Sequence, residues 1–352
     1  MHRGRPHDLA LRAVADASFT NMGAGTRNHL IIVTLVIALF GLIDLLWLPF
    51  STVDFSPRNW FDIGRIAIGL IAAWATAKFV LKRLGSDASA MASAIRCLSK
   101  SLLMLVSAAL AFIPLTIATT VFMYLATATA RPFVDGQLAS LDARLGFDWL
   151  AFLAASNQSA VWSSALFYAY HSLGPQVPVV LFVHLIRQRR DRVFEFIALM
   201  AVSSLFTGPL MAIFPAAGAY AFYRPAPELF SNLTAQAGMW HYSTLSSLRS
   251  GAPYELIVSK AEGLVTFPSF HTALGILVVY AVRDVRPLFV VALMVNAIMI
   301  VSTLPEGGHH LIDVIVGAVI GVISVAAIRM SSHSWGKAGS VARATAGSTA
   351  SH

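Results

Sequence analysis

The sequence predicts an all-α integral membrane protein, a helical bundle of about eight transmembrane spans. Of its 352 residues, 57% are hydrophobic and only 12% are charged. The mean hydropathy of +0.71 is far from that of a soluble domain, in which about a quarter of the residues are charged. The apolar residues gather in eight runs, most of which have the length that an α-helix needs to cross a bilayer.

The predicted spans follow one another from residue 29 to residue 329. They lie at 29–50, 62–81, 101–127, 160–186, 193–214, 268–282, 287–304 and 310–329. Residues 1–28 have no apolar core before a cleavage site, so we expect a cytoplasmic tail rather than a signal peptide. Residues 331–352 are polar and small, and we expect a disordered cytoplasmic tail there.

The basic residues alternate from loop to loop. With the N-terminus in the cytoplasm, 17 of the 25 Lys and Arg residues lie in inner segments and six in outer ones. This asymmetry follows the positive-inside rule and predicts a multi-pass protein of the plasma (inner) membrane. The net charge of +8 therefore reflects topology, and no basic face remains for a nucleic acid. The single Cys97 excludes an internal disulfide and a cysteine-ligated metal.

The chain divides into two accessory helices, within residues 29–100, and a core, residues 101–330. The core has long outer-face loops at 128–159 and 215–267. In the first loop, Leu138, Leu141 and Leu145 recur at helical spacing, which fits a helix in the membrane interface or one that caps the bundle from outside. The second loop is too long for a simple connection, and its aromatic residues favour a folded lid.

Two polar stretches stand at the outer ends of apolar runs, where both could converge. Pro268-Ser269-Phe270-His271 opens the sixth span, and Gly307-Gly308-His309-His310-Leu311-Ile312-Asp313 opens the eighth. Residues four apart share a helical face, so His309 and Asp313 suggest a nucleophile with an orienting carboxylate, and His271 a proton donor. His310 lies about 100° around the helix from His309, and we expect it to matter far less.

Each motif alone is weak, because a single helical His is more often a structural residue than a catalyst. Their conjunction carries the argument. Gly307-Gly308 would let a substrate approach the backbone, and a helix that starts at Pro268-Ser269 favours an anion. Together they predict an enzyme that handles phosphate. Zinc is the chemical rival, but His309 and Asp313 lack a third ligand nearby, so we expect no metal and no cofactor.

These motifs resemble those of the type 2 phosphatidate phosphatase (lipid phosphate phosphatase) superfamily. Pro268-Ser269-Phe270-His271 is similar to the family's Pro-Ser-Gly-His, and Ser302-Thr303-x5-His309-x3-Asp313 to its Ser-Arg-x5-His-x3-Asp. Arg131-Pro132 retains the end of a third motif, Lys-x6-Arg-Pro. The resemblance covers residues 120–330 and implies a six-helix catalytic core. It also implies His309 as the nucleophile, Asp313 as its partner and His271 as the acid.

Two basic positions of the phosphatases are occupied by Tyr124 and Thr303 in this chain. This departure looks closer to the branch that contains inositol phosphorylceramide and sphingomyelin synthases. Other groups must then neutralise the phosphate, and the outer-face candidates are Arg249, Lys260 and Arg131. Ser269 and the N–H groups around it would hold a phosphate oxygen.

Three functions remain open at this stage. The first is transfer of a phospho-headgroup, for example phosphoinositol, from a phospholipid to a lipid alcohol such as ceramide or diacylglycerol. The second is hydrolysis of a lipid phosphate or a polyprenyl pyrophosphate at the same His/His/Asp site. The third is a non-catalytic protein that binds lipid headgroups through a relic site, against which intact His271, His309 and Asp313 count. The sequence makes no prediction about oligomeric state.

Overall fold

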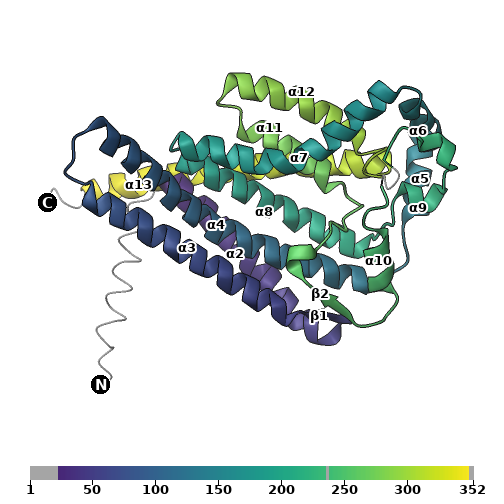
Figure 1. The fold of residues 1–352 in the computed structure, drawn as a ribbon, viewed down its shortest axis with the longest axis horizontal. Coiled ribbons are helices and arrows are strands. Elements are labelled where there is room, and N and C mark those ends of the chain that lie inside the picture. The colour runs from purple at the N-terminus through teal and green to yellow at the C-terminus, as the bar shows by residue number, and fades with distance from the viewer. Residues whose placement is uncertain (1–22, 235–237, 349–352) are drawn as a thin grey trace.

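A computed structural model describes residues 23–234 and 238–348, and its long helices form one bundle (Figure 1). The long and medium helices are α2 (Ala24–Trp47), α3 (Pro57–Arg83), α4 (Ala90–Ala128), α7 (Ala160–Ile186), α8 (Arg190–Ile213), α11 (Phe270–Ala281), α12 (Arg286–Ser302) and α13 (Leu311–Ser348). Each predicted span corresponds to one of them. The predicted all-α membrane fold is confirmed.

Six of these helices are long and apolar enough to cross a membrane, namely all but α11 and α12. Helix α11 has 12 residues and α12 has 17. At 1.5 Å per residue α11 is about 18 Å long, well short of the roughly 30 Å of hydrocarbon in a bilayer. The candidate site lies at the first turn of this short helix.

The shorter elements gather at one end of the bundle, on the right in Figure 1. They are η1 (Leu48–Phe50), β1 (Val53–Phe55), α5 (Asp135–Arg144), α6 (Trp149–Asn157), α9 (Ala219–Tyr223), η2 (Pro227–Phe230), α10 (Tyr242–Arg249), β2 (Tyr254–Leu256) and η3 (Val258–Lys260). Strands β1 and β2 pair in parallel, with Asp54 opposite Glu255. The described part of the predicted lid, 215–234 and 238–267, is therefore folded and joined to the connection between α2 and α3.

Helix α8 is the centre of the bundle. It packs against α2, α4, α11 and α13, and its residues from Val193 to Val202 are buried on every side. A helix that is apolar all round needs neighbours on all faces, which explains why the sequence of α8 shows almost no amphipathic period. Helices α2, α3, α4, α7, α12 and α13 leave large apolar side chains on the outside.

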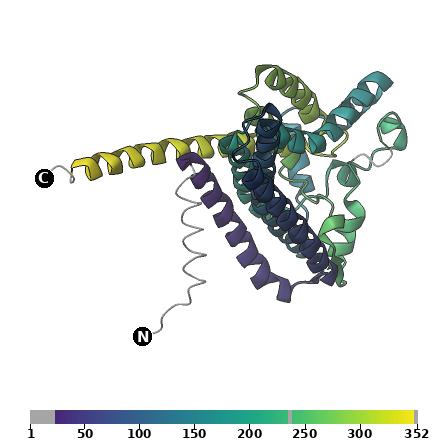
Figure 2. The ribbon, with the colours of Figure 1, turned by 60° about the vertical axis from the view of Figure 1, so that its left-hand side comes forward.

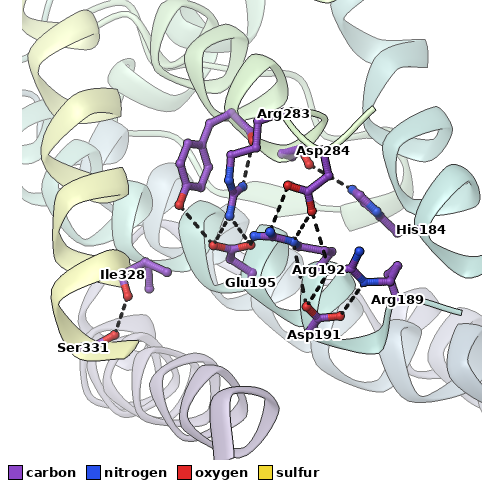
Figure 3. Close-up of polar contacts among 11 residues, drawn as sticks. His184, Arg189, Asp191, Arg192, Glu195, Arg283, Asp284, Ile328 and Ser331 are labelled. Carbon is purple, nitrogen blue, oxygen red and sulfur yellow. Dashed lines mark hydrogen bonds and ion pairs between the residues drawn. The ribbon is translucent and has the colours of Figure 1, made fainter. Parts of the chain in front are cut away.

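An ion network joins the start of α8 to the turn after the end of α11 (Figure 3). The carboxylate of Glu195 lies 2.7 Å from Arg192 and 2.7 Å from Arg283, and Arg192 also lies 2.7 Å from Asp284. The buried His184 lies nearby, with Nε2 3.0 Å from the carbonyl of Ala281. These contacts fix the turn after α11, and with it the direction in which α11 points at the site.

One expectation needs correction, and one alternative that the sequence left open is resolved. The disordered tail predicted from residue 331 is helical as far as Ser348, because α13 continues through an Ala- and Ser-rich stretch that contains no Pro and extends away from the bundle (Figure 2). In the loop 128–159, α5 packs on α13 and α9 and so caps the bundle. Its buried face carries Asp135, Leu138 and Asp142, whereas Leu141 and Leu145 are 40% and 57% exposed.

Candidate active site

His309 and Asp313 meet at the start of α13. His309 lies just before the helix, and its Nδ1 is 3.3 Å from Oδ2 of Asp313. The same oxygen accepts the backbone N–H of His310 at 2.9 Å. Asp313 is fully buried and His309 is only 2% exposed. Because Nδ1 faces the carboxylate, Nε2 is the nitrogen that is left to react.

His271 faces this pair from the first turn of α11. Its ring centroid lies 6.4 Å from that of His309, and the two rings are inclined at 60°. Tyr170 of α7 stacks on His271 with 4.8 Å between centroids, which fixes the orientation of the imidazole. The structure therefore brings together three of the residues that the sequence singled out, namely His271, His309 and Asp313.

Close packing of α11 on α13 sets this distance. Ser269 caps α11 by accepting the N–H of Thr272, and its own backbone N–H donates to the carbonyl of Asp313 at 3.0 Å. A Cβ on Gly317 would stand 2.3 Å from the carbonyl oxygen of Ser269, so only glycine lets the helices approach. Ser269 is fully buried and its hydroxyl also accepts from Thr272, so it acts as a cap in this structure.

The segment that leads to His309 is held in place by hydrogen bonds that its carbonyl oxygens accept. Ala219 donates to Gly308, Gly238 to Glu306, and Trp149 Nε1 to His309 at 3.1 Å. Gly308 has φ +65°, and a Cβ there would stand 2.8 Å from the Cα of Gly238. Gly308 thus admits the lid backbone and Gly307 the rings of His309 and Tyr170, whereas the sequence suggested an approach for substrate.

His310 lies between two buried carboxylates that the sequence did not single out. Its Nε2 is 3.4 Å from Asp135 and its Nδ1 is 3.6 Å from Asp142. Burial opposes protonation of His310, but the two carboxylates outweigh it and raise the pKa to about 9. The ring is therefore an imidazolium at neutral pH, in contrast to the minor role expected for it.

The two carboxylates also accept backbone N–H groups from two other segments. Asp142 accepts from Leu311 and Ile312, both at 2.9 Å, and so caps α13. Asp135 accepts from Ala217 and Gly218 at 2.9 and 2.8 Å. We call Asp135, Asp142 and His310 the buried ion cluster. It ties α5 to the turn that carries His309.

Two further polar residues border the site. His241 is buried, with Nε2 3.3 Å from the carbonyl of Ala217, and burial lowers its pKa. Glu306 is fully buried: one carboxylate oxygen accepts from Thr234 at 2.5 Å, and Oε1 has no partner among the described residues. Glu306 lies three residues before His309, but its contact with Thr234 depends on how the lid folds, as does the position of His241.

The three proposed basic residues do not contact the histidines in the described part of the chain. The guanidinium of Arg249 donates to the carbonyl of Arg131 and lies 3.9 Å from the ring of Phe133. It also lines a small cavity with Thr266 and Phe267, just before Pro268. Lys260 is exposed at the end of η3, and Arg131 is exposed after α4.

The neutral replacements at the two basic motif positions are occupied by other contacts. Tyr124 accepts the N–H of Glu262 at 2.9 Å, and Thr303 Oγ1 donates to the carbonyl of Ile300 at 2.6 Å. Both are buried. The described residues also contain no cluster of His, Cys, Asp or Glu with the geometry of a metal site.

Comparison with known proteins gives one positive finding. The family model of the PAP2 superfamily matches residues 136–327, from the start of α5 to the end of the apolar part of α13. This range includes His271, His309 and Asp313. No curated protein and no solved structure matches the chain.

Proposed function

The chain belongs to the PAP2 superfamily, whose chemistry is that of phosphatases and phosphotransferases acting on lipids, and from this premise we propose a phosphotransferase. It moves a phospho-headgroup, for example phosphoinositol, from a phospholipid to a lipid alcohol such as ceramide or diacylglycerol. The observation that carries the proposal is the buried His309–Asp313 pair facing His271, at a site where positions 124 and 303 are neutral.

In the first step, Nε2 of His309 attacks the phosphorus of the donor. A bond forms between nitrogen and phosphorus, and the bond from phosphorus to the diacylglycerol oxygen breaks. Asp313 holds the Nδ1 proton of His309 and stabilises the positive charge that develops on the ring. His271 gives a proton to the departing oxygen, so diacylglycerol leaves neutral.

In the second step, His271 takes a proton from the hydroxyl of the acceptor. The acceptor oxygen attacks the phosphorus, the bond to His309 breaks, and the ring returns to its neutral form. The atoms balance without any further reactant. Water could replace the acceptor, but the buried setting of His309 and Asp313 favours an alcohol that arrives within the bilayer.

The neutral residues at positions 124 and 303 indicate how much negative charge the phosphate of the donor carries. Phosphoryl transfer needs groups that offset the negative oxygens in the transition state. A diester such as phosphatidylinositol has one negative charge on its phosphate, whereas a monoester has nearly two. With Tyr124 and Thr303 engaged elsewhere, the site suits a diester. We propose Arg249 as the main cation, since it shares a cavity wall with Thr266 and Phe267, with Lys260 and Arg131 as weaker candidates.

We further propose that the end of the bundle with the short elements faces the outer, periplasmic side of the plasma membrane. The alternation of basic residues supports this orientation. Because α11 is only 12 residues long, its first turn would lie below the level of the lipid headgroups when its other end reaches the opposite surface. A phospholipid could then present its phosphate to His271 from the side.

The proposal is tested with purified protein and phosphatidylinositol carrying a labelled headgroup. We expect a new labelled lipid only when ceramide, or a diacylglycerol whose acyl chains differ from those of the donor, is added, with little free inositol phosphate, and neither product with His309→Ala. Phosphatidate should turn over more slowly than the diester. Fast release of phosphate from phosphatidate or a polyprenyl pyrophosphate, with no dependence on added alcohol, would instead establish the phosphatase alternative.

A further inference from the structure

A large apolar cavity lies between α2, α3 and α4, outside the candidate active site. Its volume is about 980 Å³, at the upper end of the range for ligand pockets. Helix α4 packs against both α3 and α2. The cavity lies between α2 and α3, with α4 as its third wall. A cavity of this kind inside a bilayer fills with hydrocarbon rather than water, because its walls offer almost no polar atoms.

Asp44 is the exception in this wall. It lies in the last turn of α2, its side chain is buried, and Oδ1 has no partner among the described residues. An ionisable group inside a membrane is costly without a partner, and such residues usually mark a binding site or an ion path. The twenty residues that line the cavity include no Lys, Arg or His to pair with it.

The missing cation restricts the ligand. A phospholipid would bring a negative phosphate to a carboxyl group in an apolar wall, with nothing to offset the charge. A neutral hydroxyl group can instead donate a hydrogen bond to the free oxygen of Asp44 without bringing a second negative charge into the cavity. Two acyl chains fill the apolar part of the cavity. We infer that this cavity binds a two-chain neutral lipid with a free hydroxyl, such as diacylglycerol, through Asp44.

The polar end of the cavity lies at the end of the bundle that carries the short elements. Asp44 precedes β1, which pairs with β2 in the loop that leads to His271. Helix α4 separates the cavity from that loop, and its Tyr124 accepts the N–H of Glu262. Under the proposed function, on which this part rests, the cavity holds the acceptor or the released diacylglycerol. The binding itself can be measured without turnover.

The test is photolabelling of the purified protein with a photoreactive diacylglycerol, beside photoreactive phosphatidate and a photoreactive diacylglycerol whose hydroxyl is methylated. We expect labelled peptides from α3 and α4 with the free hydroxyl alone. Asp44→Leu should lower this labelling at least tenfold. Gly41→Leu should do the same by filling the cavity, since a side chain at Gly41 meets no atom within 4 Å. Asp54→Asn, at an exposed aspartate of β1, is the matched control.

Equal labelling by all three probes, or unchanged labelling in both cavity variants, would overturn the inference. Crosslinks between two copies of the chain through α3 would overturn it as well, because the cavity would then be part of an interface between the copies. His309→Ala should bind the probe normally. No transfer by the wild type, with binding of the probe intact, would contradict the proposed function alone, whereas normal transfer by the wild type with no binding of the probe would contradict this inference alone.

Discussion

His309→Ala is expected to reduce headgroup transfer at least about 10⁴-fold, because no other group can form the covalent bond to phosphorus. His271→Ala should reduce it about 10³-fold or more, since the leaving oxygen would depart as an alkoxide. Asp313→Asn should reduce it at least about 10²-fold, because an amide cannot stabilise the developing imidazolium. Steady-state rates, measured beside the elution profile and melting temperature of each variant, separate catalysis from folding.

A double variant tests whether these residues act together. Residues that act as one unit are not additive, so His309→Ala with Asp313→Asn should be no slower than His309→Ala alone. His241→Gln, at a buried neighbour outside the proposed chemistry, should retain far more activity than any of the three. Retention of more than a tenth of the activity in His309→Ala would remove it as the nucleophile.

His310→Ala is expected to have the largest effect on stability. Its removal leaves Asp135 and Asp142 buried side by side with no cation. Breaking a buried ion pair in this way costs about 3–5 kcal/mol. The melting temperature in detergent should fall, and activity should fall with it, because Asp142 also caps the helix that carries Asp313. Asp135→Asn together with Asp142→Asn should restore part of the stability of His310→Ala. No recovery, or a wild-type melting temperature in His310→Ala, would contradict this account.

The same cluster predicts a dependence on pH. The pKa of His310 is raised from 6.5 to about 9, so the folded protein holds the proton more strongly than the unfolded chain. The resulting stabilisation is complete below about pH 6.5 and is lost as the pH rises through about 9. We expect the melting temperature of the wild type to fall across this window, and that of His310→Gln to stay nearly level. Parallel curves for the two proteins would show that another group titrates.

The sequence predicted the fold well because each span is a long apolar run with basic residues at alternate ends. The predicted boundaries of α7, 160–186, agree with the helix, and most others agree within a few residues. The start of α4 was missed by eleven residues, because Ala90–Lys100 is helical but contains the charged residues Arg96 and Lys100 and was assigned to an inner loop. The end of α13 was missed because composition alone cannot separate a helix that projects from the bundle from an irregular tail.

The site was only partly predictable. The four-residue spacing identified His309 and Asp313 as a pair. The predicted topology placed His271 at the same end of the bundle. Asp135 and Asp142 were not identified, although residues seven apart also share a helical face. The spacing of Leu138, Leu141 and Leu145 indicated a different apolar face, and only Leu138 lies on the buried side with the two carboxylates. Tyr170 and His241 carry no signal at all, since their roles depend on long-range packing of α7 and the lid.

The central claim is that a phospho-headgroup passes through a covalent bond to His309. Its most direct test is to mix the protein with phosphatidylinositol labelled in the headgroup phosphate, without acceptor, and quench in alkali, where phosphohistidine survives. We predict label on the peptide that contains His309, its disappearance when ceramide or diacylglycerol is added, and its absence in His309→Ala. Label on a different residue, or transfer at full rate with no labelled protein at any time, would contradict the account.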